Sequence, residues 1–257
     1  MIHRAKQLLS VNMLENITLL KMLETYGDKM ECKLMERERD WGLLLSLPIQ
    51  LSLYDRKTYP ECEAIILVSG SDPNSIAPLV EALPQDRPII FKVQNDAYKQ
   101  VIATKFSLEL KRAFHTYSCT EPTRHMQLEE VAEEDRYQDK LAELWIRNGY
   151  EAGELQRMFD AGARSYSIYE LGEPVSTCLT CCIYGKVWEI GAVFTKESYR
   201  GKGYAKKVVS AAVNRLLNEQ SVPRYQVVND NAASIQLAES LGLSREVTLQ
   251  HYVYKGM

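Results

Sequence analysis

Apolar residues recur along this chain with two different periods, and each period predicts a different kind of element. The opening segment MIHRAKQLLSVNMLENITLLKMLE repeats its leucine, isoleucine and methionine positions at helical spacing, which predicts helix. Further on, the runs CEAIILVSG and RPIIFKV predict strands, and the segments DPNSIAPLVEAL and NDAYKQVIATKF that follow them predict helices. This strand, helix, strand, helix order is typical of an α/β layer.

The pattern breaks at CTEPTRH, where Pro122 and polar residues interrupt it. We therefore expect two domains of mixed α/β class, with residues 1–121 in the first and 122–257 in the second. In the second, strands are expected at 126–131, 165–169, 174–183, 187–195, 225–228 and 244–254, and helices at 134–148, 152–159, 202–218 and 232–241.

The segment EIGAVFTKESYRGKGYAKKVV runs from an expected strand through a glycine turn into an expected helix. Strand alternation predicts an apolar face that covers a helix layer and places Glu189 on the opposite face. The residues of the apolar face are Trp188, Ile190, Ala192 and Phe194. Past the turn, apolar residues at helical spacing predict a buried helix that begins at or just after Gly203.

Such a turn suits a pyrophosphate, because a helix start presents unpaired N–H groups and glycines let an anion approach the backbone. Arg200, Lys202, Lys206 and Lys207 add positive charge there. RGKGYAK lacks the hydroxyl of a Walker loop and the third glycine of a dinucleotide fingerprint. An ordinary solvated basic turn is the alternative.

Two motifs at this point resemble the GNAT superfamily of N-acetyltransferases. YRGKGYA is similar to the family's Q/R-x-x-G-x-G/A pyrophosphate loop, and VNDNAASIQLAESLGL is similar to its second motif. The resemblance implies a GNAT fold from residue 126 onward. A narrower likeness connects NAASIQLAESLGL to zwittermicin-resistance proteins and WEIGAVFT to glycine N-acyltransferases. In such proteins the first half is itself a degenerate GNAT-like domain.

The resemblance implies an acyl-CoA site, with acetyl-CoA as co-substrate, where two parallel strands separate. Strand-like backbone contacts to the pantetheine arm are implied near Val193 and Thr195, and pyrophosphate binding by the N–H groups from Arg200 to Ala205. The implied binding residues are Val193, Phe194, Thr195, Arg200, Gly201, Lys202, Gly203, Tyr204, Ala205, Asn231 and Ser234.

Glu189 is the expected general base, since a carboxylate within an apolar strand is uncommon and matches the glutamate of the glycine N-acyltransferase pattern. A Glu solvated in an open cleft is the alternative. Many GNAT enzymes carry a tyrosine as acid to the departing sulfur, and Ala238 stands at that position here. Tyr252, Ser234 or water is left to protonate the thiolate, or the thiolate leaves as the anion. Tyr252 is the residue we select, with a packing role in the closing strand as its alternative.

The sequence thus predicts an N-acyltransferase that moves an acetyl or other acyl group to a primary amine of a small molecule. A non-catalytic acyl-CoA sensor or structural module, or an amino-acid N-acyltransferase of glycine type, is the alternative. Net charge is −3, which favours neither nucleic acid nor an anionic membrane as partner. No histidine spacing predicts a metal site. A homodimer is left open.

Six cysteines without an export signal predict reduced thiols and a cytoplasmic protein. Cys178 and Cys181 form a CxxC, but they fall in an expected strand, where residues three apart face opposite ways. We therefore expect both to be core residues and not a redox or metal pair.

Overall fold

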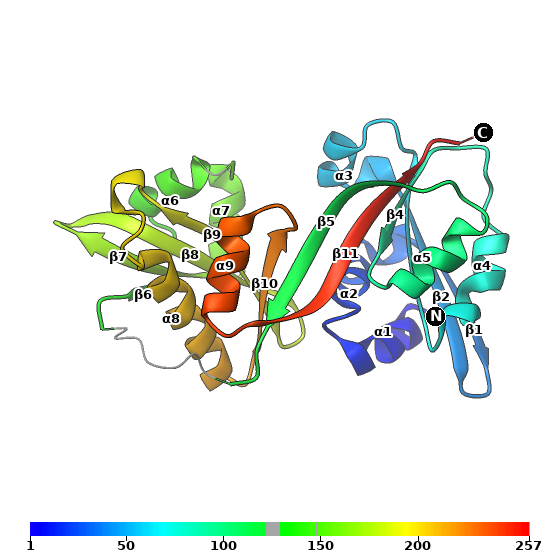
Figure 1. The fold of residues 1–257 in the computed structure, drawn as a ribbon, viewed down its shortest axis with the longest axis horizontal. Coiled ribbons are helices and arrows are strands. Elements are labelled where there is room, and N and C mark those ends of the chain that lie inside the picture. The colour runs from blue at the N-terminus through cyan, green and yellow to red at the C-terminus, as the bar shows by residue number, and fades with distance from the viewer. Residues whose placement is uncertain (122–128, 148, 257) are drawn as a thin grey trace. The chain divides into compact units, whose positions relative to one another are not determined.

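The computed structural model describes residues 1–121, 129–147 and 149–256, and it divides into two compact units. Unit 1 consists of Met1–His115 and Glu246–Met257, and unit 2 of Thr116–Arg245. The chain passes from unit 1 to unit 2 within strand β5 (Glu109–Ser118) and returns within strand β11 (Ser244–Tyr254). Both strands are labelled in Figure 1.

Unit 1 is a mixed sheet with helices on it. Its sheet order is β1-β2-β3-β4-β11-β5, in which β3 and β4 are parallel and β11 is antiparallel to β4. The helices are α1 (Ile2–Leu9), α2 (Ile17–Tyr26), α3 (Leu53–Thr58), α4 (Ala77–Glu81) and α5 (Asp96–Ala103). The remaining strands are β1 (Glu31–Arg37), β2 (Asp40–Pro48), β3 (Ala64–Gly70) and β4 (Ile89–Val93).

Alternation along the strands of unit 1 separates its two sheet faces. Phe91 and Ile66 pack in one apolar cluster with Leu79 of α4 and Ile102 of α5. Ser69 lies on the other face, where its hydroxyl donates to Asn16 at the start of α2, at 2.8 Å. The apolar runs read from the sequence therefore form a buried sheet between helices.

Unit 2 has the sheet order β10-β9-β8-β7-β6, and the end of β5 lies beside β10. Its strands are β6 (Ala132–Glu134), β7 (Arg164–Glu170), β8 (Glu173–Tyr184), β9 (Val187–Thr195) and β10 (Val222–Val228). Its helices are α6 (Asp139–Ile146), α7 (Ala152–Asp160), α8 (Tyr204–Asn218) and α9 (Ala232–Ser240). Of the strand expected at 126–131, residues 126–128 lie outside the described part and 129–131 are not strand, since β6 begins at Ala132. Residue 134 is the end of β6, so α6 begins later than the helix expected at 134–148.

The helices of unit 2 cover opposite faces of the sheet. Val208 and Val213 of α8 and Ala238 of α9 pack in one buried cluster with Ile190 of β9. Trp145 of α6 belongs to a second cluster, with α7 and Leu179 of β8. Figure 1 shows α8 and α9 apart from α6 and α7 across these strands.

The strand faces expected of β9 hold only for its first half. Ile190 packs in the α8 cluster as expected, but Ala192 packs against the α6 and α7 cluster, and Val193 packs against the α8 cluster. The backbone of Ala192 is left-handed, with φ 51°, and the register with β8 shifts between Thr177 and Leu179. This β-bulge adds a residue to β9 and exchanges its faces, which corrects the uninterrupted alternation read from the sequence.

The compact units differ from the expected domains at the last strand. The first boundary falls between His115 and Thr116, close to residue 121, but residues 246–257 belong to unit 1 and not to unit 2. The reason lies in pairing, because β11 is hydrogen-bonded to β4 from Gln250 opposite Val93 onward. Strand pairing between segments far apart in the chain leaves no local sequence signal.

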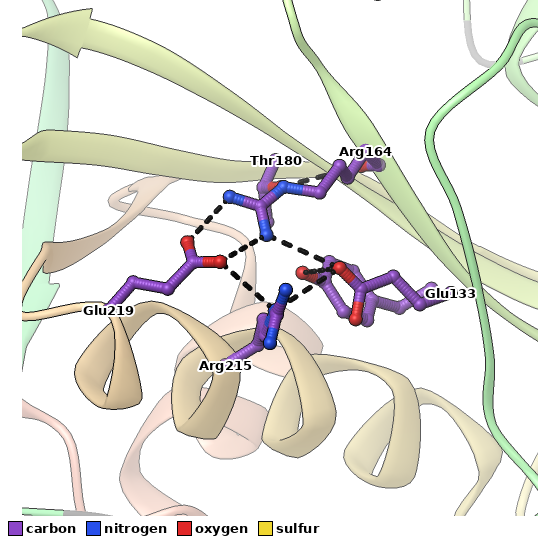
Figure 2. Close-up of polar contacts among 6 residues, drawn as sticks. Glu133, Arg164, Thr180, Arg215 and Glu219 are labelled. Atoms are coloured by element: carbon purple, nitrogen blue, oxygen red, sulfur yellow. Dashed lines mark hydrogen bonds and ion pairs between the residues drawn. The ribbon is translucent and has the colours of Figure 1, made fainter.

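Charged side chains tie the C-terminal end of α8 to the sheet, as Figure 2 shows. Arg164 of β7 contacts Glu219 at 2.6 Å and Glu133 at 3.2 Å, and Arg215 of α8 contacts Glu219 at 3.1 Å. The bond from Arg164 lowers the pKa of Glu219. This network holds the end of α8 that is remote from the glycine turn.

Candidate functional site

Strands β9 and β10 run side by side only at their beginnings. Their parallel ladder starts at Val187 and its last pair is Ile190 with Tyr225, although β9 continues to Thr195. In the described part of the chain, the β9 edge past Ile190 therefore has no ladder partner from β10, and its backbone groups are free to bind an extended molecule. Val193, Phe194 and Thr195, the expected pantetheine contacts, are half-buried in this segment.

The glycine turn has the backbone that its glycines permit. Gly201 and Gly203 have φ of 77° and 79°, a left-handed conformation that L side chains rarely adopt. A Cβ added at either glycine would meet nothing within 4 Å. The turn therefore needs glycine for its conformation, and the space outside it is open.

The start of α8 is open as well. Gly203 is its N-cap, no side chain of the described residues accepts from its first N–H groups, and its first turn contains no acidic residue. The N–H groups around Tyr204 and Ala205 thus face out with the positive helix end behind them. This end of α8 therefore presents main-chain donors without a side-chain partner among the described residues.

The basic side chains of the turn are held near it. Arg200 donates from Nε to the carbonyl of Thr195 at 3.3 Å, and the Lys202 ammonium lies 4.7 Å from the centre of the Tyr199 ring. Lys207 pairs with Glu130. Arg200 and Lys202 are exposed, so both offer positive charge to an anion at the helix start.

Asn231 and Ser234 stand together at the start of α9. The Asn231 side-chain oxygen accepts from the Ser234 N–H at 3.1 Å, which caps the helix. Local capping thus explains the asparagine, whereas position 234 contributes only its main-chain N–H to this bond. The pair lies in the turn after β10, the strand that separates from β9.

Glu189 has a partner that the sequence analysis did not identify. Arg224 of β10 lies opposite Glu189 in the parallel ladder, and its Nη1 contacts Glu189 Oε2. The Arg224 side chain is only 6% exposed, against 27% for Glu189. A charged residue within the run VPRYQVV was the available signal, since an arginine in a buried strand requires a partner.

Tyr150 is a second residue that the sequence analysis did not identify. It packs against the cluster of α6 and α7, and burial raises its pKa to about 12, with Glu189 and Cys181 as further causes. Its hydroxyl therefore remains protonated at neutral pH. Nothing in the local sequence distinguishes it from other tyrosines.

Tyr252 belongs to the other compact unit. It lies on β11 within unit 1, is 4% exposed, and packs in the apolar cluster with Phe91 and Phe106. Lys99 lies 5.6 Å from the centre of its ring. Ala238, which stands where a tyrosine was expected, is fully buried in the α8 cluster.

Of the two cysteines of the CxxC, Cys178 is a core residue as expected, whereas Cys181 is only half-buried. All six cysteines are free, and Cys178 is fully buried and donates to the carbonyl of Val208 at 3.4 Å. Burial raises the pKa of the Cys178 thiol. Among the described residues no cluster of histidine, cysteine and carboxylate side chains has the arrangement of a metal site.

Unit 1 has a helix start at the corresponding place, and it is closed. The turn after β3 leads into a short 3₁₀ helix, where Asp72 Oδ1 accepts from the Asn74 N–H at 2.8 Å. Beside β3, the Gln94 side-chain amide donates to the Val68 carbonyl at 3.0 Å. An aspartate cap thus occupies the position that an anion takes at an open helix start, and an amide bonds the β3 backbone.

A model of GNAT acetyltransferases matches residues 53–252, which is more than half of the chain. The protein belongs to this family. The match includes β9, the glycine turn and the start of α9. GNAT acetyltransferases transfer acyl groups and use acetyl-CoA as co-substrate, which agrees with the open helix start and the separated strands.

Solved structures of GNAT proteins share the fold at low identity. A GCN5-related N-acetyltransferase from Kribbella flavida is 13% identical with a TM-score of 0.59, and covers 95% of each chain. A GNAT acetyltransferase from Colwellia psychrerythraea is 11% identical with a TM-score of 0.56, over 95% of this chain and 97% of that one.

A tandem GNAT protein from the clavulanic acid biosynthesis pathway is 13% identical with a TM-score of 0.51, over 94% and 88% of the two chains. That likeness supports a two-domain arrangement. A search of curated proteins gave no match. In the described residues no helix is both long enough and apolar enough to span a membrane.

Proposed function

We propose that unit 2 transfers an acyl group, most simply acetyl, from acyl-CoA to the primary amine of a small molecule. One observation carries the proposal: the uncapped start of α8 follows, after a short 3₁₀ turn and the glycine turn, on the β9 segment that has separated from β10. Main-chain donors from Arg200 to Ala205 would bind the pyrophosphate, and Val193 to Thr195 the pantetheine arm. Asn231 and Ser234 would line the same arm.

Bound acyl-CoA supplies the thioester, and the chain supplies the proton acceptor and the oxyanion donor. The amine nitrogen forms a bond to the thioester carbon, Glu189 accepts the amine proton directly or through water, and the C–S bond then breaks. A backbone N–H near Val193 donates to the oxyanion. The thiolate leaves with a proton from water or as the anion, because Ala238 carries no acid and Tyr252 is buried in unit 1.

Unit 1 has no part in acyl-CoA binding in this proposal, because Asp72 already caps its helix start. The protein then binds one acyl-CoA per chain. All six cysteines are free thiols, which supports the reducing cytoplasm as its compartment.

Gly203→Glu tests the proposed site. The carboxylate would lie at the anion position, so CoA affinity is expected to fall by about 100-fold or more in calorimetry. Gly172→Glu is the matched control, because Gly172 is an exposed glycine with φ 80° and open space around it in the β7–β8 turn. Equal CoA affinity in both variants would refute the site.

A non-catalytic acyl-CoA sensor is the second candidate, and the buried Ala238 in place of the expected acid favours it. Thiol release from acetyl-CoA with a panel of primary amines separates the two functions. The panel should include glycine, since an amino acid is the other acceptor class that the sequence indicates. Release with an amine supports the transferase, and CoA binding without release supports the sensor.

A further inference from the structure

Glu189 and Arg224 lie on the same face of the unit 2 sheet. Their neighbours Ile190 and Tyr225 pack in the α8 cluster, so by strand alternation both charged side chains point to the opposite face. They are opposite each other in the parallel ladder, one pair before the ladder ends. The ion pair therefore lies at the place where β9 and β10 separate.

The two oxygens of Glu189 have different surroundings. Oε2 contacts Arg224 Nη1, whereas Oε1 lies 3.9 Å from the position of a Cβ built on Gly191. Gly191 is the first residue of β9 past the ladder. One oxygen is thus held by the buried arginine, and the other lies beside Gly191.

Arg224 itself is enclosed. The residue is 5% exposed, and its Nε atom is buried without a hydrogen-bond partner among the described residues. A buried arginine that loses hydrogen bonds needs a compensating charge, and Glu189 is the carboxylate that contacts it. Arg224 lies too deep to bind a substrate and is well placed to fix Glu189.

We propose that Arg224 is a positioning residue that holds Oε2 of Glu189, so that Oε1 alone receives the proton of the attacking amine. The inference rests on the acyltransferase function proposed above. Arg224 touches no reacting atom and acts only through Glu189. Its removal should lower kcat and leave the affinity for CoA unchanged.

The variants are Arg224→Gln, Arg224→Lys, Glu189→Gln and the double variant Glu189→Gln/Arg224→Gln. Loss of Arg224 is expected to lower kcat by about 10- to 100-fold, since small misplacements of a catalytic group have effects of this size. Arg224→Lys should be intermediate, because lysine keeps the charge but loses the planar fork. If Arg224→Gln does not fold, Arg224→Lys alone provides the comparison, in wild-type and Glu189→Gln backgrounds.

The decisive readout is whether the losses in kcat caused by the Arg224 and Glu189 substitutions are additive in free energy in the double variant. If Arg224 acts through Glu189, its substitution changes kcat by less than about 2-fold in the Glu189→Gln background. A purely structural arginine would slow both backgrounds by the same factor, and that result overturns the inference. A shift in the Kd for CoA of more than about 10-fold in the Arg224 variants would also overturn it.

Arg164→Gln is the control for loss of an ion-paired sheet arginine. Arg164 contacts Glu219 and its guanidinium lies 5.0 Å from the ring centre of Trp188, the residue before Glu189. Its loss should lower stability without changing kcat. A wild-type protein that binds no CoA refutes the proposed function, and with it the inference. If the wild-type protein binds CoA and turns over, and the losses in kcat from the Arg224 and Glu189 substitutions are additive, only the inference is refuted.

Discussion

Ala192 decides, at the scale of a single residue, which side chains of β9 face which helices. Its φ of 51° is unfavourable for an L residue, and it accompanies a bulge that puts Val193 on the same face as Ile190 and Ala192 on the other. The strain is concentrated next to the segment that we assign to the pantetheine arm.

The effect of a substitution at Ala192 should depend on how readily the new residue adopts a positive φ. Ala192→Val is expected to lower the free energy of unfolding by about 1–2 kcal/mol and to weaken CoA binding, because a β-branched residue resists this conformation. Ala192→Gly should keep both properties. Urea unfolding and calorimetry measure the two, and a valine variant as stable as the glycine variant would contradict a strained bulge.

His251 gives unit 1 a pH-dependent stability. It is 2% exposed, its Nδ1 bonds the Tyr59 hydroxyl at 2.7 Å, and burial lowers its pKa to about 3, with Lys92 and Arg112 as further causes. Unfolded histidine titrates near pH 6.5. Below that pH the unfolded chain binds a proton that the folded chain refuses, so stability falls as pH falls from 6.5 toward 3.

Between pH 7 and pH 5 this residue should lower the free energy of unfolding by about 2 kcal/mol. His251→Gln is expected to be less stable than the wild type at both pH values. It should lose less stability between pH 7 and pH 5, since glutamine does not titrate. Urea titrations at the two pH values test this. If the variant loses as much unfolding free energy between pH 7 and pH 5 as the wild type, His251 is excluded as the titrating group.

The helical turn after β3 and the start of α8 differ in their capping residue. The helix start after β3 is capped by the Asp72 side chain, whereas that of α8 begins at Gly203 with no side-chain cap. A capped start has satisfied its own N–H group, and an uncapped one leaves donors for a ligand.

Asp72→Ala should therefore affect stability and not binding. Loss of the cap is expected to lower the free energy of unfolding by about 1 kcal/mol, with CoA affinity unchanged and one CoA bound per chain. Denaturant unfolding and calorimetric stoichiometry measure these. A second CoA bound by the wild-type chain would show that unit 1 is not closed.

The compact units are not two consecutive segments of the chain, because β11 from Glu246 onward belongs to unit 1. In that unit β11 stands between β4 and β5, and Tyr254 packs edge-on against Phe106 with ring centres 5.0 Å apart. A fragment of residues 1–121 lacks this strand and exposes the cluster that it covers.

We expect residues 1–121 alone to show no cooperative unfolding transition. The same fragment followed by a Gly/Ser linker and residues 246–257 should unfold cooperatively, because the linker restores β11 to its place. Circular dichroism during urea titration compares the two. Cooperative unfolding of residues 1–121 alone would mean that β11 is dispensable to unit 1.

The sequence by itself determined the features that depend on neighbouring residues. Helical and strand periods gave the main elements, and the glycines at 201 and 203 with the following apolar helix predicted the open turn of α8. These signals are local, since a left-handed turn needs glycine wherever it occurs. The family resemblance rested on the same local motifs.

Tertiary structure alone decided what depends on register and on pairing between distant segments. The bulge at Ala192 exchanged strand faces, β11 joined unit 1, and Arg224 met Glu189 across a parallel ladder. Each of these features depends on how strands pair. Local periodicity does not encode the pairing register, and a shift of one residue in that register moves every side chain of a strand to the other face of the sheet.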